Sequence, residues 1–130
     1  MSQFRYKALD TSRSIRLLQF LKGPKPVCNM ITVEVEKAPP YVALSYTWGE
    51  KMLSNQIQVN GQMIPITANL GDAVGAIYEY ARERNMMLWA DSICINQADI
   101  QERSQQVRLM NTIYRSAEIV AIWLGAAADE

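Results

Sequence analysis

Apolar and polar residues along this chain follow two kinds of spacing. Apolar runs of strand length, bounded by Gly, Pro and Asn, cover residues 14–22, 30–36, 41–49, 86–90 and 118–125. Two longer segments, 70–84 and 99–116, carry apolar side chains three and four positions apart, which predicts helices. Residues 56–66 alternate around Asn60-Gly61, a pair that predicts a β-hairpin with a type I′ turn.

The order of these elements predicts an α/β protein. From residue 41 onward strands alternate with helices, which favours an open, mostly parallel sheet flanked by helices and joined by right-handed crossovers. Continuous apolar runs predict core strands that are covered on both faces, whereas residues 30–36 alternate and predict a half-exposed strand. We expect one domain over residues 1–130, with an N-terminal antiparallel strand pair at 14–40 and a core at 41–125 that contains the inserted hairpin.

Composition narrows the classes of function. Thirteen basic residues balance thirteen acidic ones, so we expect no nucleic-acid or anionic-lipid partner. No apolar run approaches the roughly 20 residues of a membrane span, and no secretory signal is evident, so we expect a cytoplasmic protein. The chain has no histidine and two distant cysteines, which argues against a metal site and against a Ser-His or Cys-His pair. We expect Cys94 to be a buried, unreactive side chain.

Both predicted helices begin with the spacing of a capping box. Asn69 with Asp72 predicts the start of the first helix, and Asp99 with Glu102 predicts the start of the second. Glu102 also has a functional alternative, since a carboxylate aimed into a cleft stabilises a developing cation or orients a sugar hydroxyl. The sequence leaves both roles of Glu102 open.

The predicted inward face of the second helix changes character along its length. Its C-terminal half is apolar and consists of Val107, Met110, Ile113, Tyr114 and Ala117. The same face, continued backwards, carries Asp99, Arg103 and Gln106. A helix that only packs would keep an apolar stripe throughout, so this pattern predicts a polar cleft near the start of the helix.

Polar residues also gather where the core strands end. Open sheets of this type bind ligands beyond the carboxyl ends of their strands. The candidates that follow two core strands are Ser45, Tyr46, Trp48, Asp91, Asn96 and Gln97. Each has a structural alternative: a strand-end carboxylate binds arginine or turn amides, a tryptophan packs in the core, and amide side chains suit a turn.

Three blocks of this sequence resemble the fungal HET (heterokaryon incompatibility) domain. They are YVALSYTWGE, ITANLGDAVGAI and LWADSICINQADIQERSQQVRLMNTIYRSAEIVAIWLG, in the order typical of that family, and they cover roughly residues 41–125. The resemblance implies a cytosolic fungal cell-death effector of the self/non-self recognition type. Members of the family usually continue beyond the last of these blocks, so the resemblance leaves two alternatives open: an excised domain or a short family member.

HET domains are similar to TIR domains, which implies a flavodoxin-like sheet here. Some TIR domains cleave NAD at the nicotinamide–ribose bond with a glutamate on the helix after a central strand, and Glu102 is the comparable residue. The resemblance therefore implies NAD as a substrate, Glu102 and Asp91 as catalytic residues, no required cofactor or metal, and activity in the assembled state. The nucleotide-binding residues that we expect are Ser45, Tyr46, Trp48, Asn96, Gln97 and Arg103. The alternative is a non-enzymatic domain that self-associates and recruits partners.

Overall fold

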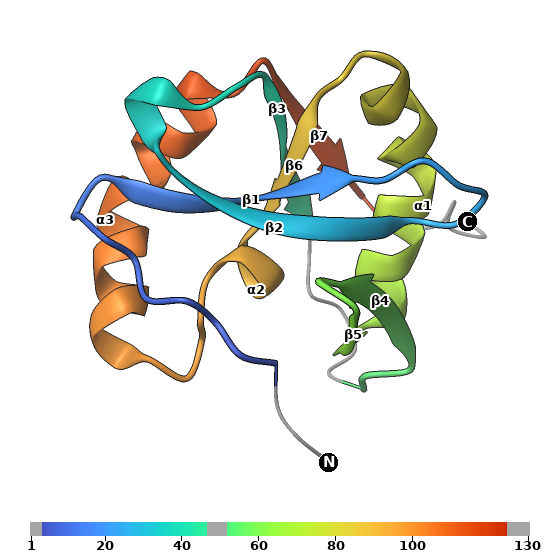
Figure 1. The fold of residues 1–130 in the computed structure, drawn as a ribbon, viewed down its shortest axis with the longest axis horizontal. Coiled ribbons are helices and arrows are strands. Elements are labelled where there is room, and N and C mark those ends of the chain that lie inside the picture. The colour runs from blue at the N-terminus through green and yellow to red at the C-terminus, as the bar shows by residue number, and fades with distance from the viewer. Residues whose placement is uncertain (1–3, 47–51, 125–130) are drawn as a thin grey trace.

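One mixed sheet forms the centre of the molecule (Figure 1). The computed structural model describes residues 4–46 and 52–124, and within these ranges seven strands have the order β5-β4-β2-β1-β6-β3-β7. The strands are β1 (Ser14–Phe20), β2 (Val27–Glu34), β3 (Tyr41–Tyr46), β4 (Asn55–Val59), β5 (Gln62–Ile66), β6 (Met87–Ala90) and β7 (Ile119–Trp123).

Helices cover both faces of the sheet. They are α1 (Ala68–Glu83), α2 (Asp91–Cys94) and α3 (Ile100–Ser116), with a 3-10 turn, η1 (Val35–Lys37), between β2 and β3. Figure 1 shows α1 and α3 on opposite sides of the sheet. The Tyr41 hydroxyl donates to the carbonyl of Ile113 in α3, and Trp123 donates to Asn69 in α1 at 3.0 Å. Alternate residues of β3 and β7 therefore face different helices.

The predicted α/β sheet is confirmed in part: the core strands are parallel and the N-terminal pair and the hairpin are antiparallel as expected, but the sheet as a whole is mixed because the N-terminal pair joins it. β3 pairs in parallel with β6 and β7, and β2 pairs in parallel with β4. β1, however, is antiparallel to both of its neighbours, β2 and β6, and the β4–β5 hairpin is antiparallel as well. The N-terminal pair thus continues the core sheet, with β1 at its middle, and Ser14 to Leu18 are buried on both faces.

The last strand also differs from its expectation. Its apolar run predicted a strand covered on both faces, but β7 is an edge strand in the described sheet. Val120 and Ile122, on the face that does not contact α1, are exposed. The run of apolar side chains did not indicate burial because no described element covers that face of β7.

Several local predictions are confirmed. Asn60 and Gly61 both have positive φ, 52° and 77°, as a type I′ hairpin turn requires. Asp99 caps α3 by accepting a hydrogen bond from the Glu102 amide at 3.1 Å. The cap of α1 is corrected: Thr67 accepts from the Leu70 amide at 3.2 Å, and the helix begins before Asn69, whose side chain instead binds Trp123.

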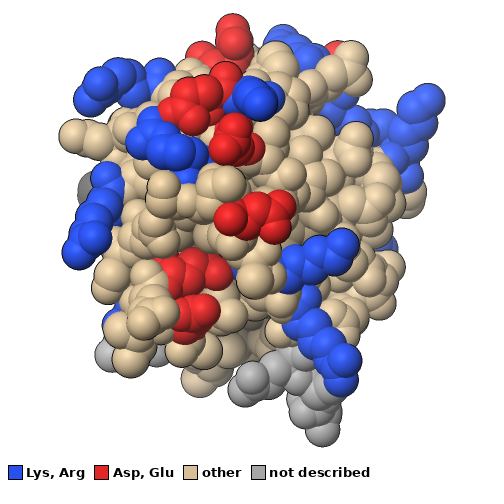
Figure 2. Space-filling view, turned by 60° about the vertical axis from the view of Figure 1, so that its left-hand side comes forward, with Lys and Arg blue, Asp and Glu red and all other residues tan. Residues whose placement is uncertain are grey.

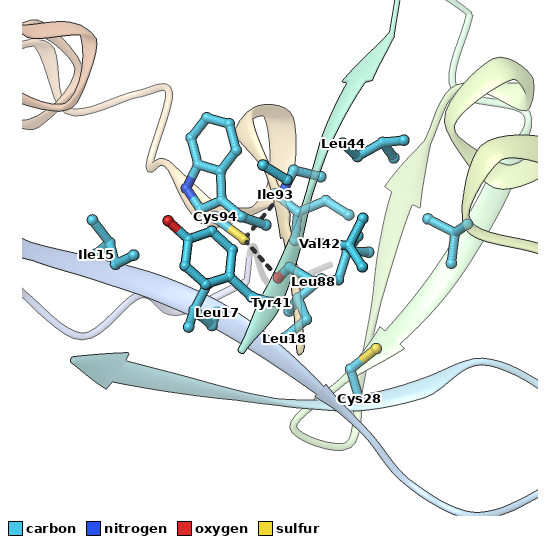
Figure 3. Close-up of a cluster of buried hydrophobic side chains, with 14 of the residues drawn as sticks. Ile15, Leu17, Leu18, Cys28, Tyr41, Val42, Leu44, Leu88, Ile93 and Cys94 are labelled. Carbon is cyan, nitrogen blue, oxygen red and sulfur yellow. Dashed lines mark hydrogen bonds between the residues drawn. The ribbon is translucent and has the colours of Figure 1, made fainter. Parts of the chain in front are cut away.

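The core lies between the sheet and its helices (Figure 3). Trp89 is fully buried and packs edge-on against Tyr114 at a centroid distance of 5.4 Å. Cys94 is buried as expected, and burial raises the pKa of its thiol to about 12. Figure 3 shows Cys28 and Cys94 in separate parts of this cluster, and both are free thiols.

Candidate functional site

A small cavity opens at the carboxyl ends of β3 and β6, where the sequence predicted a site. It has a volume of about 220 Å³, and its polar lining comes from Tyr46, Thr67, Ser92 and Gln97. The hydroxyl groups of Tyr46 and Ser92 are hydrogen-bonded to each other. The Gln97 amide nitrogen donates to the Asp91 carbonyl at 3.0 Å, which fixes the turn between α2 and α3 against the first residue of α2.

Asp91, the first residue of α2, is not among the residues that line this cavity, but its carboxylate acts electrostatically on Tyr46 and on Tyr114. Burial raises the pKa of Tyr46, and the nearby Asp91 carboxylate raises it further. Burial also raises the pKa of Tyr114 on α3; Asp91 adds to this shift, and the Ser45 side chain partly offsets it. The structure thus gathers Ser45, Tyr46 and Asp91 around the strand ends.

Glu102 is held in a separate network by a buried arginine. Arg16 is 1% exposed, and its two terminal nitrogens donate to the two Glu102 carboxylate oxygens at 2.6 and 2.8 Å. The Asn96 amide donates to the same carboxylate at 2.7 Å. The side chain of Glu102 is 9% exposed, so this is a largely buried ion pair with additional hydrogen bonds.

Neither role predicted for Glu102 describes this geometry. Its carboxylate does not complete a capping box, since the Asp99 amide donates to the carbonyl of Asn96 at 3.1 Å. It also does not line the cavity beside Tyr46; it lines a different hollow, of about 350 Å³, with Asp99 and residues 8–12. Glu102 instead fixes the Asn96–Gln97 turn, and that turn supplies one wall of the cavity at the strand ends.

The inward face of α3 is rotated from its prediction. Gln106 is buried and donates to the Ser14 carbonyl at 2.8 Å, and Leu109 and Ile113 continue the buried stripe. Arg103 and Val107 are exposed. Glu102 and Gln106 at the N-terminal end of α3 bind β1, which offers a buried cation and a carbonyl, so the polar side chains there do not line the cavity at the strand ends. Trp48 lies outside the described residues.

Sequence reasoning missed Arg16, the centre of the Glu102 network. Its nitrogens also donate to the Cys94 carbonyl at 3.1 Å and the Lys7 carbonyl at 2.6 Å. No role of this side chain was predicted from the sequence, yet a lone arginine between Ile15 and Leu17 was a usable signal. A cation in a strand that is buried on both faces requires a carboxylate partner.

The surface offers no strongly charged face of one sign in the view of Figure 2, where acidic and basic side chains are interspersed. Among the helices of the described ranges, none is long and apolar enough to cross a membrane. The cavity at the strand ends, which is lined by the predicted residues Tyr46 and Gln97, is the candidate functional site.

Comparisons with known proteins point in the same direction as the three sequence blocks. Residues 41–130 match the family model described as Heterokaryon incompatibility protein (HET). The chain is 40% identical over 136 residues to a Neurospora crassa protein named Heterokaryon incompatibility protein 6, OR allele. The match covers 93% of this chain and 20% of that protein, so the chain spans about a fifth of that relative. No solved structure matches the chain.

Proposed function

This chain belongs to the heterokaryon incompatibility (HET) family, and from that premise we propose that it is a cytoplasmic cell-death effector domain that cleaves NAD. The parallel strands β6, β3 and β7, flanked by α1 and α3, support a TIR-like core confined to this part of the sheet. β1, antiparallel beside β6, is an addition to such a core.

One observation carries the catalytic part of the proposal: two hydroxyl groups and an amide line the cavity at the carboxyl ends of β3 and β6, and the Asp91 carboxylate, outside this lining, is near enough to act on Tyr46. Asp91 acts on Tyr46 electrostatically, Tyr46 bonds Ser92, and Gln97 bonds the Asp91 backbone. The cavity of about 220 Å³ has room for one ring of a nucleotide, so the nicotinamide enters it and the remainder lies along the sheet edge.

The reaction is hydrolysis of the bond between nicotinamide and ribose. The bonding electron pair leaves with nicotinamide, positive charge develops on the ribose carbon, and water adds to give ADP-ribose and a proton. Asp91 stabilises the developing cation, as carboxylates do in glycosidic cleavage. Tyr46 and Gln97 position the ring.

Glu102 serves as a positioning residue in this mechanism. Arg16 neutralises its charge at close range, which weakens any effect on a cation in the neighbouring cavity. Its bond to the Asn96 amide instead holds the turn that carries Gln97. We propose Asp91 as the catalytic carboxylate in place of Glu102, because its charge acts on Tyr46 in the wall of the cavity.

A second candidate function, assembly without catalysis, is favoured by the exposed edge of the sheet. Val120, Ile122 and Leu124 are 42%, 68% and 86% exposed on or beside β7. An apolar edge strand pairs readily with another strand, including one from a second copy of the chain. In this case death follows from self-association and recruitment of partners.

NAD consumption by the purified chain, fused to an oligomerising tag to cluster it, tests both functions. We expect free nicotinamide to be released, Asp91→Asn to lower the rate on the order of a hundredfold or more, and exposed Asp72→Asn to leave it unchanged. If Asp91→Asn keeps its activity and a folded Glu102→Gln variant loses it, Glu102 and not Asp91 is the catalytic carboxylate.

A cell-death assay with the untagged chain, combined with the NAD measurement, separates catalysis from assembly. Ile122→Lys places a charge on the exposed edge without touching the cavity, so it is expected to block self-association of the untagged chain. Cell death that survives Asp91→Asn but is lost in Ile122→Lys, with no NAD turnover in any variant, would establish the assembly function and exclude the catalytic one.

A further inference from the structure

A larger cavity, of about 750 Å³, lies between the N-terminal segment and the β1–β2 pair. We propose that it binds a small sugar phosphate. This volume falls in the range of ligand sites, roughly 300–1,000 Å³. The site does not share a lining residue with the cavity at the strand ends, so it stands independently of the proposed NAD cleavage.

The floor and one wall of the cavity are built from elements far apart in sequence. Arg16 and Thr32 are paired across β1 and β2, so their side chains share one face of the sheet. The N-terminal segment is tied over this face by two bonds of 2.6 Å: the Tyr6 hydroxyl donates to the Ile93 carbonyl, and Arg16 donates to the Lys7 carbonyl. Figure 1 shows this segment running past α2, below β1 and β2.

The turn of the β4–β5 hairpin contributes a further polar group. The Asn60 side-chain oxygen accepts from the Met30 amide at 2.8 Å, and this bond fixes the orientation of the amide group. The oxygen is thereby engaged with β2, and the amide nitrogen is the donor that Asn60 contributes to the cavity. Together with the Thr32 hydroxyl it suits the hydroxyl groups of a sugar.

The cavity is electropositive in a chain of zero net charge. Arg5, Lys7 and Arg16 line it against a single carboxylate, Asp10, which leaves an excess of two positive charges. Glu102 pairs with Arg16 from outside the lining and lowers that excess to one. An anion is therefore the favoured ligand, and arginine and lysine are the side chains that bind phosphate.

Arg16 supplies an independent indication of a ligand. It is 1% exposed and lines the cavity, and its Nε–H is a buried donor with no hydrogen-bond partner among the described residues. The two terminal nitrogens are already engaged by Glu102, Cys94 and Lys7. A buried unsatisfied donor is unfavourable, and an anion in the cavity would reach this Nε–H after a shift of the side chains that cover it.

The lining also distinguishes a sugar phosphate from a nucleotide. No aromatic side chain is among the described residues of this cavity, so it lacks a stacking surface for a base. Inorganic phosphate alone would leave most of the 750 Å³ unfilled. A pentose phosphate carries both the charge and the hydroxyl groups that this lining complements.

Calorimetric titration of the whole chain with ribose 5-phosphate, AMP and inorganic phosphate tests the site. The decisive variant is Arg5→Ala with Lys7→Ala, which removes two cationic side chains and keeps the Lys7 carbonyl that Arg16 binds. Lys22→Ala with Arg108→Ala removes the same charge at positions outside the cavity. We expect ribose 5-phosphate to bind the wild-type chain. The Arg5→Ala, Lys7→Ala variant should raise its dissociation constant on the order of tenfold or more, and the Lys22→Ala, Arg108→Ala control should change this constant by less than about twofold.

Further arms make the assignment specific. Thr32→Val replaces the hydroxyl with a methyl group of similar shape, and it is expected to weaken ribose 5-phosphate but not inorganic phosphate. Asp91→Asn is expected to leave binding unchanged, which separates this site from the proposed catalytic one. Absence of ribose 5-phosphate binding, equal losses in both double variants, or inorganic phosphate binding as tightly as the sugar phosphate would each overturn the proposal.

Discussion

Arg16→Met removes the buried cation of the Arg16–Glu102 pair and keeps an unbranched side chain that matches arginine as far as about Nε. The wild-type guanidinium makes two hydrogen bonds to the Glu102 carboxylate and one each to the carbonyls of Cys94 and Lys7. After the substitution, the 9% exposed carboxylate keeps only the Asn96 amide among these partners. The dominant cost is the uncompensated buried charge that remains.

The magnitude follows from the burial of both partners. Removal of one partner from a buried ion pair costs about 3–5 kcal/mol, a large part of the roughly 5–15 kcal/mol that stabilises a typical domain. For a domain of this size we expect the melting temperature to fall by roughly 10–15 °C. Arg16→Met with Glu102→Leu should cost less than the sum of the single changes by about 2 kcal/mol, since it leaves no lone charge.

Urea unfolding monitored by tryptophan fluorescence measures these free energies, because Trp89 is fully buried in the folded chain. A loss below about 1 kcal/mol in Arg16→Met would refute the assigned energetic role of the pair. Additive losses in the double variant would show that Arg16 and Glu102 are not coupled, and the role of Glu102 in holding the Asn96–Gln97 turn would then lose its basis.

Two other predictions concern the thiols and the hairpin. Burial raises the pKa of Cys28 and Cys94 to about 12, so a disulfide exchange reagent should modify neither at neutral pH unless urea is added. The neutral thiols contribute fully to the stability of the fold below their ordinary pKa of 9.0, and this contribution declines as the pH rises from 9.0 towards about 12. Rapid modification of the native thiols would contradict the first expectation. A urea midpoint that stays constant over this pH range would contradict the second. Gly61→Ala places a side chain at φ 77° and should lower the free energy of unfolding by about 1 kcal/mol, measured by urea unfolding, whereas an unchanged midpoint would argue against the type I′ turn.

The local elements were readable because their signals lie within a few residues. Asn60 and Gly61 predict positive φ at both central positions of a hairpin, and the structure has it. Asp99 predicts the start of α3 because its side chain is within reach of the Glu102 amide. The predicted cap of the first helix was two residues too late because Thr67 and Asn69 are both residues that favour the N-cap position. Asn69 binds Trp123 instead, and this contact spans 54 residues, so the local sequence did not reveal it.

The site was predictable in its place and only partly in its residues. Strand ends of a parallel sheet meet at one edge, so Tyr46 and Gln97 were brought to one cavity as expected. Ser92 was missed because α2 is a single short turn with no periodic signal. The partner of Glu102 was missed because Arg16 lies 86 residues away, on a strand whose place in the sheet the periodicity does not reveal.

The sequence by itself determined the α/β class, the hairpin, the second helix cap and the family resemblance, all of which depend on nearby residues or on shared blocks. Only the tertiary structure decided that β1 lies antiparallel at the middle of the sheet. That position buries Arg16, and Glu102 forms an ion pair with this buried cation. As a result Glu102 does not line the strand-end cavity. Hydrophobic periodicity specifies which faces of a strand are buried but does not specify which strands are neighbours. The order of the strands in the sheet is set by pairing between residues far apart in the sequence.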